Sequence, residues 1–368
     1  MDRRPLSLLP FVFFVFLFFV LVPAKALAQI TPESGYEAEE LADPDPAPMD
    51  WNSLLAYYDG LLIYAGSDQR IRAFDPETGI SQVVADLSAD LNFSFGPSGL
   101  LVSDDGYLYF GDNTIPPTGL VYRLRLSANW PAAVEGLATG ASGSIFSFTQ
   151  NPGTHTIWFA SADFGAGANM YLYEVPLAFN SAAVQKAAFP APHGGGNGPI
   201  IFLDASTLLY GESPFGGDGY FHQVNTATGN IVIQDYLHFA GGLAGAVYGF
   251  DGKIYVTTGA GMAVYRISGQ TKMQVASTTL DAQALAFDDK TLFISLQKSS
   301  DFSGEIHFGA ITKKPDTGGG GGGGGGGCFI RAAAGEIPKA RPLPVLLGLL
   351  GAMAIRRFVR GRPRPRVD

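Results

Sequence analysis

The sequence predicts an all-β fold, a six-bladed β-propeller, with an N-terminal signal peptide before it and a C-terminal transmembrane sorting helix after it. Three observations support this prediction. One strand pattern returns six times between residues 51 and 315, no part of that region has the periodicity of a long amphipathic helix, and both ends of the chain resemble targeting segments in composition. Aromatic residues make up 12% of the 368 residues, which suits packed strands.

Residues 1–28 are expected to be a signal peptide. Two arginines precede an almost unbroken apolar stretch, residues 6–22, and small residues follow at the positions that a signal peptidase reads. This order predicts cleavage between Ala28 and Gln29. The alternative is an uncleaved anchor helix, because the apolar stretch is close to the length that crosses a bilayer.

The body of the chain is acidic. Residues 29–50 are acidic and rich in proline, and they are expected to be a linker. Between residues 29 and 317 there are 30 acidic and 12 basic residues, although the whole chain has a net charge of only −9. Such a body repels phosphate backbones, and it has no basic patch interleaved with aromatic residues, so the sequence predicts no nucleic-acid partner.

The repeat is clearest in the second strand of each unit. Six apolar strand centres follow one another at spacings of 46, 49, 51, 46 and 38 residues: Ile63, Tyr109, Trp158, Leu209, Tyr255 and Phe293. Units of this length with four strands each are typical of propeller blades. The alternative, a β-sandwich, also uses short strands and regular turns, but sandwiches lack a repeat of this length.

Third strands and their turns follow in order. Alternating apolar residues predict third strands over residues 70–74, 120–124, 171–175, 220–224 and 263–267. Two of these strands lead into similar turns that end in glycine, residues 75–79 and 225–229, and such turns close a tight bend before a fourth strand.

The most complete unit is residues 99–112, with the sequence Gly-Leu-Leu-Val-Ser-Asp-Asp-Gly-Tyr-Leu-Tyr-Phe-Gly-Asp and weaker echoes at residues 247–258 and 285–296. This unit is similar to NHL-type repeats and to the related gluconolactonase-like and strictosidine-synthase-like six-bladed propellers. The resemblance covers the central 260 residues or so and implies the architecture, since propellers have many functions. No residue-by-residue match to the gluconolactonase-like metal ligands is present.

The order of strands in a blade predicts two unlike faces. Turns between first and second strands are short, whereas the loops after second and fourth strands are long and rich in glycine. Binding residues usually lie on long loops of a rigid scaffold, so the long-loop face is the expected site. Its candidate residues are Asp68, Asp112, Asn113, Asp163, His193, Asn197, Glu212, Asp218 and His238.

Oxygen-bearing residues in this set suggest a calcium site. Asp112 and Glu212 lie three residues after their strand centres, and Asp68 and Asp163 lie five after theirs. Carboxylate and amide oxygens at a channel mouth are ligands for a hard cation such as calcium. The alternative is turn chemistry, because aspartate and asparagine are common in tight turns.

The C-terminal end has a different composition. Residues 316–327 are expected to be a glycine-rich tether, and residues 328–368 a sorting or anchor tail with a short hydrophobic helix over 342–355. The order of Cys-Phe-Ile, apolar segment and arginine cluster resembles the tripartite sorting signals of exported bacterial proteins. The resemblance implies membrane association through the helix, a sorting peptidase as partner, and processing or lipid attachment at Cys328, the single cysteine.

The expected function is therefore an exported propeller at the cell envelope or cell surface, which binds a protein, a glycan or a small ligand through its long-loop face. Whether it is released from the envelope stays open. The alternative is a calcium-dependent hydrolase or lactonase of gluconolactonase-like type, and a passive spacer is a third hypothesis. The chain has no nucleophile elbow, Walker loop or dinucleotide fingerprint, and its five histidines have no metal-ligand spacing, so the sequence names no catalytic residue.

Overall fold

The computed structural model describes ten segments of the chain, residues 29–41, 54–66, 68–88, 96–112, 118–127, 129–163, 167–176, 178–196, 198–297 and 306–315. All of them belong to one unit, residues 1–319. The predicted signal peptide, glycine-rich tether and sorting tail lie outside the described residues. Within the described part, no helix is long and apolar enough to cross a membrane.

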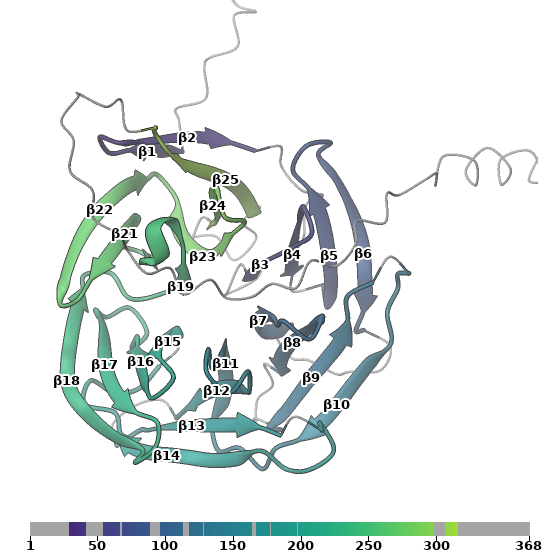
Figure 1. Ribbon diagram of the computed structural model, residues 1–368, viewed down its shortest axis with the longest axis vertical. Helices are drawn as coiled ribbons and strands as arrows, with labels where there is room; N and C mark the ends of the chain where they lie inside the picture. Colours follow the sequence, from purple (N-terminus) through teal and green to yellow (C-terminus); the bar gives the residue numbers. More distant parts are fainter. Residues whose placement is uncertain are drawn as a thin grey trace, which may run out of the picture. The chain divides into compact units, whose positions relative to one another are not determined.

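The described strands form six antiparallel sheets around a common centre, which confirms the predicted six-bladed propeller (Figure 1). Blade 1 contains β3 (Leu54–Tyr58), β4 (Leu61–Gly66), β5 (Arg70–Asp75) and β6 (Ile80–Asp86). Blade 2 contains β7 (Pro97–Val102), β8 (Tyr107–Asp112), β9 (Leu120–Arg125) and β10 (Val134–Ala138). Blade 3 contains β11 (Ser144–Gln150), β12 (Ile157–Ala162), β13 (Asn169–Val175) and β14 (Val184–Pro190).

The second half of the ring repeats this order. Blade 4 contains β15 (Ile200–Asp204), β16 (Thr207–Glu212), β17 (Gly219–Asn225) and β18 (Asn230–Phe239). Blade 5 contains β19 (Gly245–Tyr248), β20 (Ile254–Thr258), β21 (Ala263–Ser268) and β22 (Thr271–Thr278), with a short 3₁₀ turn over Phe250–Gly252. Blade 6 contains β23 (Asp281–Phe287), β24 (Thr291–Gln297) and β25 (Ile306–Lys313).

Burial follows the position of a strand within its blade. All six residues of the second strand β12 are buried, because this strand has a paired strand on each edge and a neighbouring blade on each face. The outermost strand β14 is mostly exposed, with only Ala187 and Phe189 buried. The six apolar centres recognised in the sequence all lie in second strands.

The two predicted glycine-ended turns have the same hydrogen bonds. Asp75 Oδ1 accepts from the backbone N–H groups of Glu77 and Thr78. Asn225 Oδ1 accepts in the same way from Ala227 and Thr228. Both turns end on a glycine with a φ near +70°, which an L side chain rarely adopts, so the local sequence alone determines this bend.

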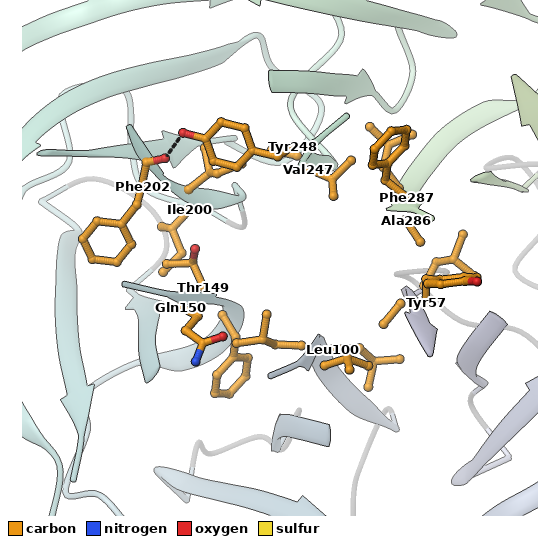
Figure 2. Close-up of a pocket in the computed structure, with 18 of the residues that line it drawn as sticks. Tyr57, Leu100, Thr149, Gln150, Ile200, Phe202, Val247, Tyr248, Ala286 and Phe287 are labelled. Atoms are coloured by element: carbon orange, nitrogen blue, oxygen red, sulfur yellow. Dashed lines mark hydrogen bonds between the residues drawn. The ribbon is translucent and has the colours of Figure 1, made fainter. Parts of the chain in front are cut away.

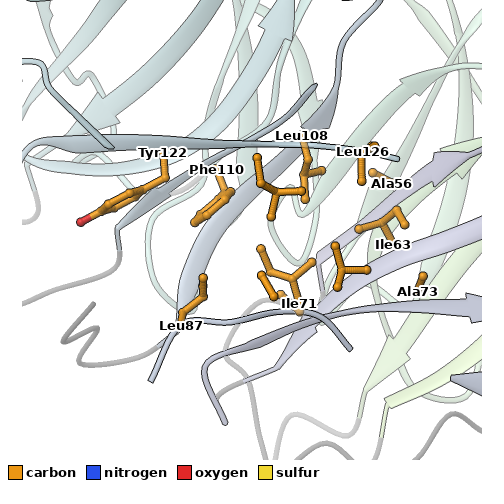
Figure 3. Packing of buried hydrophobic residues seen from close by; sticks show 13 residues of the cluster. Ala56, Ile63, Ile71, Ala73, Leu87, Leu108, Phe110, Tyr122 and Leu126 are labelled. Carbon is orange, nitrogen blue, oxygen red and sulfur yellow. The ribbon is translucent and has the colours of Figure 1, made fainter. Parts of the chain in front are cut away.

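The core consists of apolar layers between adjacent blades. Between blades 1 and 2, for example, Ile63 and Ile71 pack against Leu108 and Phe110 (Figure 3). A corresponding cluster lies between each further pair of neighbours, and the one between blades 6 and 1 closes the ring. Each blade is therefore stabilised mainly by its neighbours.

In residues 29–41 the structure shows strands where a linker was expected, and the rest of that expected linker, residues 42–50, lies outside the described residues. β1 (Ile30–Pro32) pairs with β22 at the outer edge of blade 5, and β2 (Tyr36–Glu40) pairs with β25 as the fourth strand of blade 6. Ile30 and Tyr36 are buried. An edge strand needs only a few apolar side chains and a free neighbouring edge, so an acidic composition did not prevent this segment from joining the sheets.

Candidate functional site

Glu212 organises the long-loop face of blade 4 from inside. It ends β16 and is fully buried, and its Oε1 accepts from the backbone N–H groups of His193 and Gly195, both at 2.8 Å. Its Oε2 lies 3.0 Å from Nε2 of His222, which is also fully buried. Because Nδ1 of His222 accepts from the backbone N–H of Asp235, this pattern assigns the proton to Nε2. Glu212 therefore holds the loop after blade 3 against blade 4.

The other predicted carboxylates also bond to groups of the protein itself. Asp112 is buried at the end of β8, and its Oδ2 accepts from the backbone N–H of Thr118 at 3.3 Å. Asp68 forms a two-point ion pair with Arg72. Asp163 accepts from the Tyr171 hydroxyl at 3.0 Å. Only the contact of Asp112 is of the kind that turn chemistry predicts, because Asp68 and Asp163 bond to side chains of neighbouring strands, and each carboxylate lies in a different blade or loop.

Two histidines of blade 4, His222 and His238, and His193 from the loop before it form a cluster with Tyr220 that the sequence did not reveal. The ring of His193 stacks on Tyr220 at 3.6 Å between centroids, and Tyr220 stacks on His238 at 5.0 Å. The ring of His193 also lies 6.1 Å from that of His222 and nearly parallel to it. The register explains the arrangement, since Tyr220 and His238 are cross-strand partners. His222 lies in β17, and His193 lies in the loop between β14 and β15.

Aspartates pair with His193 and His238, the two histidines of this cluster that are accessible to solvent. Nε2 of His193 lies 2.8 Å from Asp235, and Nε2 of His238 lies 2.7 Å from Asp218. The hydrogen bond from His238, followed by one from the backbone of Gly241, lowers the pKa of Asp218. Asp235 was not a predicted site residue, because it follows a register shift in β18 that the sequence pattern does not show.

The predicted oxygen ligands do not gather at one point among the residues described. Within these segments, no group of three or more histidine, cysteine, aspartate or glutamate side chains has the geometry to hold a metal ion. Asn113, Asn197 and Cys328 lie outside the described residues, as does Ala28. Gln29 is described, and it immediately precedes β1.

A cavity of about 360 Å³ occupies part of the central channel (Figure 2). All six inner strands line it, and in β7, β11, β19 and β23 the lining residues are the last three of the strand. Pro152, in the turn after β11, also lines it. Since every inner strand runs from the long-loop face to the short-turn face, the cavity lies in the half of the channel opposite the predicted site.

The wall of this cavity is mostly apolar. Leucine, valine, isoleucine, alanine and phenylalanine side chains supply most of it, and the polar side chains are those of Tyr57, Thr149, Gln150 and Tyr248. The Tyr248 hydroxyl donates to the backbone carbonyl of Phe202 at 2.6 Å, as Figure 2 shows. The Tyr57 hydroxyl accepts from the backbone N–H of Gly60 at 3.0 Å. An apolar wall with a few fixed polar groups is typical of a small-molecule site.

Aspartates lie in the turns at this end of the channel. Asp59 follows β3, Asp204 ends β15, and Asp288 and Asp289 follow β23. Burial raises the pKa of Tyr57, and the charges of Asp288, Asp59 and Asp289 raise it further. Burial likewise raises the pKa of Tyr248, with a further contribution from Asp204. The carboxylates are therefore close enough to act electrostatically on the two tyrosines of the cavity wall.

The sequence offered one indirect signal of this cavity. The short turns were recognised as a class, and the inner strands that they end are apolar along most of their length. Nothing in the local pattern indicates which half of the channel stays unfilled, because that depends on how far six separate strands approach the axis.

Comparisons with solved structures agree with the architecture. No protein-family model matches the sequence, and no curated protein matches it. A putative gluconolactonase has a TM-score of 0.53 and 16% identity, over 76% of this chain and 93% of its own. A PQQ-bound aldose sugar dehydrogenase from Streptomyces coelicolor has a TM-score of 0.51 and 12% identity, over 76% of this chain and 100% of its own.

A protein of unknown function from Bacteroides thetaiotaomicron has a TM-score of 0.56 and 12% identity, over 75% of this chain and 76% of its own. At these identities the likeness extends to the fold alone. The class of protein is thus a six-bladed β-propeller of the kind that gluconolactonase-like proteins share.

Proposed function

We propose that the chain is an exported, envelope-anchored β-propeller that acts as a binding module, and that its ligand is a small, largely apolar molecule held in the channel cavity. One observation supports this most directly. Six inner strands enclose about 360 Å³ with an apolar wall and four polar side chains. This volume and composition lie within the usual range of ligand pockets.

Binding suits this cavity better than catalysis does. Its lining residues include no histidine, cysteine, lysine, aspartate or glutamate among those described. Tyrosine, threonine and glutamine side chains orient a ligand by hydrogen bonds, whereas general acid–base chemistry uses groups that titrate near neutral pH. We therefore propose the binding site in the channel and not on the long-loop face, where the sequence suggested it.

Substitution of Val247 by tryptophan tests the cavity. Val247 lies on β19 and points into the channel in Figure 2, so the larger side chain would fill the cavity. The matched control is Val232→Trp, at a side chain that is 59% exposed on the outermost strand of blade 4. Ligand-observed NMR with small apolar fragments measures binding to the wild type and to both variants.

We expect fragments to bind the wild type and Val232→Trp, and to lose their signal with Val247→Trp. If fragments bind all three proteins equally, or bind none of them, the cavity is not a ligand site.

Export and anchoring rest on the two ends of the chain. Support for cleavage after Ala28 comes from the position of Gln29, whose carbonyl oxygen accepts from the backbone N–H of Thr279 and whose N–H donates to Glu40. A mature chain that begins at Gln29 keeps both strands β1 and β2. Its new α-ammonium group would lie beside the Glu40 carboxylate, which favours the folded state.

Mass spectrometry of both termini of the protein from the envelope fraction tests this part. A mature N-terminus at Gln29 and a C-terminus or lipid adduct at Cys328 are expected. An intact Met1 together with an unmodified tail ending at Asp368 would contradict export and sorting.

A further inference from the structure

One side of the cavity mouth is aromatic. Tyr248, Phe287 and Tyr57 line the cavity from blades 5, 6 and 1, which are neighbours in the ring (Figure 2). The ring of Tyr57 stacks on Phe293 at 6.0 Å and 8°. The ring of Phe287 lies edge-on to Phe250 at 5.1 Å. Packing on one side fixes these rings, and aromatic faces attract organic cations.

Carboxylates surround the same side. Asp59 lies two residues after Tyr57, and Asp288 and Asp289 directly follow Phe287. No described cation forms an ion pair with any of these three, whereas Asp251 in the neighbouring turn is paired with Lys313 at 2.9 Å. Because Tyr57 and Phe287 line the cavity and each of these aspartates follows one of them within two residues, their charges lie close to the cavity wall, and the same charges raise the pKa of Tyr57.

The turns of blades 5, 6 and 1 also contain two lysines without a described ion pair. They weaken but do not cancel the negative electrostatic field of the aspartates. Asp251 is neutralised by Lys313, which leaves Lys253 and Lys290 against Asp59, Asp288 and Asp289. Neither lysine forms a described ion pair with these three aspartates, which exceed the two lysines by one. The field at this side of the mouth is therefore negative, and low-dielectric apolar walls focus such a field.

We propose that the channel cavity selects small organic cations, with the ammonium group held between Tyr57, Phe287 and the carboxylates of Asp59, Asp288 and Asp289, and the apolar part of the ligand inside the channel. The class of ligand is a substituted ammonium with one apolar group. This inference rests on the proposed binding function and adds the charge of the ligand to it.

Three probes of equal apolar part test the inference on the full chain in lipid nanodiscs, with empty nanodiscs as the blank. They are benzyltrimethylammonium, benzyl alcohol and benzylsulfonate, and titration calorimetry measures each affinity. We expect the cation to bind about ten-fold more tightly than the alcohol, and the sulfonate to bind most weakly. The advantage of the cation should shrink as salt shortens the Debye length from about 30 Å at 0.01 M to about 8 Å at 0.15 M.

Two triple variants of equal charge change locate the effect. Asp59→Asn with Asp288→Asn and Asp289→Asn removes the carboxylates at the mouth. It keeps the Oδ1 of residue 288 that accepts from the backbone N–H groups of Lys290 and Thr291. The control, Glu37→Gln with Glu39→Gln and Glu77→Gln, neutralises three exposed carboxylates, on the closing strand β2 and in the turn after β5.

In the aspartate triple variant, the affinity for the cation should exceed that for the alcohol by about three-fold or less. The affinity for the alcohol should stay unchanged in both triple variants. Equal affinity of the wild type for cation and alcohol, without salt dependence, overturns the inference but leaves the apolar binding site in place. If both triple variants lose the same amount of affinity for the cation, the preference comes from net charge, and this result also overturns the inference. Failure of all three probes, together with no effect of Val247→Trp, overturns the proposed function itself.

Discussion

Glu212 shows how one buried residue can determine the shape of a loop. Its carboxyl group accepts two backbone N–H groups of the loop after blade 3 and contacts His222, and both side chains are fully buried. From the sequence, the position of Glu212 at the end of a strand suggested that it is a metal ligand. The structure gives it a positioning role for the loop instead, because its hydrogen-bond capacity is directed at the protein's own backbone.

Replacement of Glu212 by alanine should lower the free energy of unfolding by about 3 kcal/mol, because it leaves two loop N–H groups and a buried histidine without their acceptor. Glu212→Gln keeps an acceptor oxygen for the two loop N–H groups but sets its amide N–H₂ against the Nε2–H of His222, so it should cost about 2 kcal/mol. Urea unfolding measures both variants, with Glu77→Ala at an exposed turn position as the control. A loss within about 0.5 kcal/mol for Glu212→Ala would show that the loop does not depend on this group.

The raised pKa values of two tyrosines determine how the free energy of unfolding should change at alkaline pH. Burial raises the pKa of Tyr109 to about 12, and burial together with the charge of Asp112 raises the pKa of Tyr122 to about 12. The unfolded chain ionises tyrosine near pH 10. The stability from keeping these phenols neutral is therefore complete below about pH 10, and it is lost as the pH rises from about 10 to about 12.

The urea midpoint should accordingly fall steeply above about pH 10. In a variant with Tyr109→Phe and Tyr122→Phe, the fall should be shallower, since neither ring then gains a charge in the unfolded state. If the urea midpoint of the variant fell with pH as steeply as that of the wild type, these two tyrosines would not be the cause of the alkaline loss of stability.

At the scale of elements, the ring closes through β2, which lies about 270 residues before its partner β25. Tyr36 of β2 is buried, its hydroxyl lies 3.2 Å from that of Tyr255 in blade 5, and its ring lies 6.2 Å from Phe250. One aromatic side chain therefore joins the closing strand to the neighbouring blade as well as to its own.

Tyr36→Ala should lower the free energy of unfolding by about 3–5 kcal/mol, because it leaves a cavity between blades 5 and 6 and removes the partner of the Tyr255 hydroxyl. Glu37→Ala, one residue along the same strand with its side chain exposed, should change it by less than about 0.5 kcal/mol. Thermal unfolding monitored by circular dichroism compares the two. Similar losses for both would mean that strand pairing, and not the aromatic contact, holds β2.

At the scale of the molecule, adjacent blades are coupled by large side chains that cross from one to the next. Tyr210 of blade 4 is fully buried, packs edge-on against Phe146 and Phe189 of blade 3, and donates to the Ser161 carbonyl at 2.9 Å. Burial raises its pKa well above the usual value. Blades coupled in this way should unfold together.

Tyr210→Phe removes only one of the hydrogen bonds between blades 3 and 4, the one to Ser161, and it should cost about 1–2 kcal/mol while leaving one cooperative transition. Calorimetry checks this, because the van't Hoff and calorimetric enthalpies should stay equal. Splitting of the transition into two would show that blades 3 and 4 depend on this single hydrogen bond for their cooperativity.

Periodic features of the chain were predictable from the sequence. The six second strands, the third strands and the turns at residues 75–79 and 225–229 all follow from short apolar patterns and turn residues. These features are local, because a strand's alternation and a turn's hydrogen bonds involve residues only a few positions apart.

The same local patterns give no information on pairing between distant segments. β1 and β2 have an acidic composition, and only the free edges of β22 and β25 make them strands. His193, Tyr220 and His238 belong to three different elements, and the register of β17 and β18 brings two of them together. The sequence could therefore predict a long-loop face, but neither the contacts on that face nor the cavity in the other half of the channel.

The sequence by itself determined that this protein is a ring of six antiparallel blades with short turns at one end of the channel and long loops at the other. Only the tertiary structure decided that the N-terminal segment closes the ring, that the candidate carboxylates bond to backbone and side-chain groups of the protein itself, and that the cavity lies at the short-turn end. The physical reason is the range of the interactions: periodicity encodes strands locally, whereas closure and the channel depend on six strands meeting around one axis.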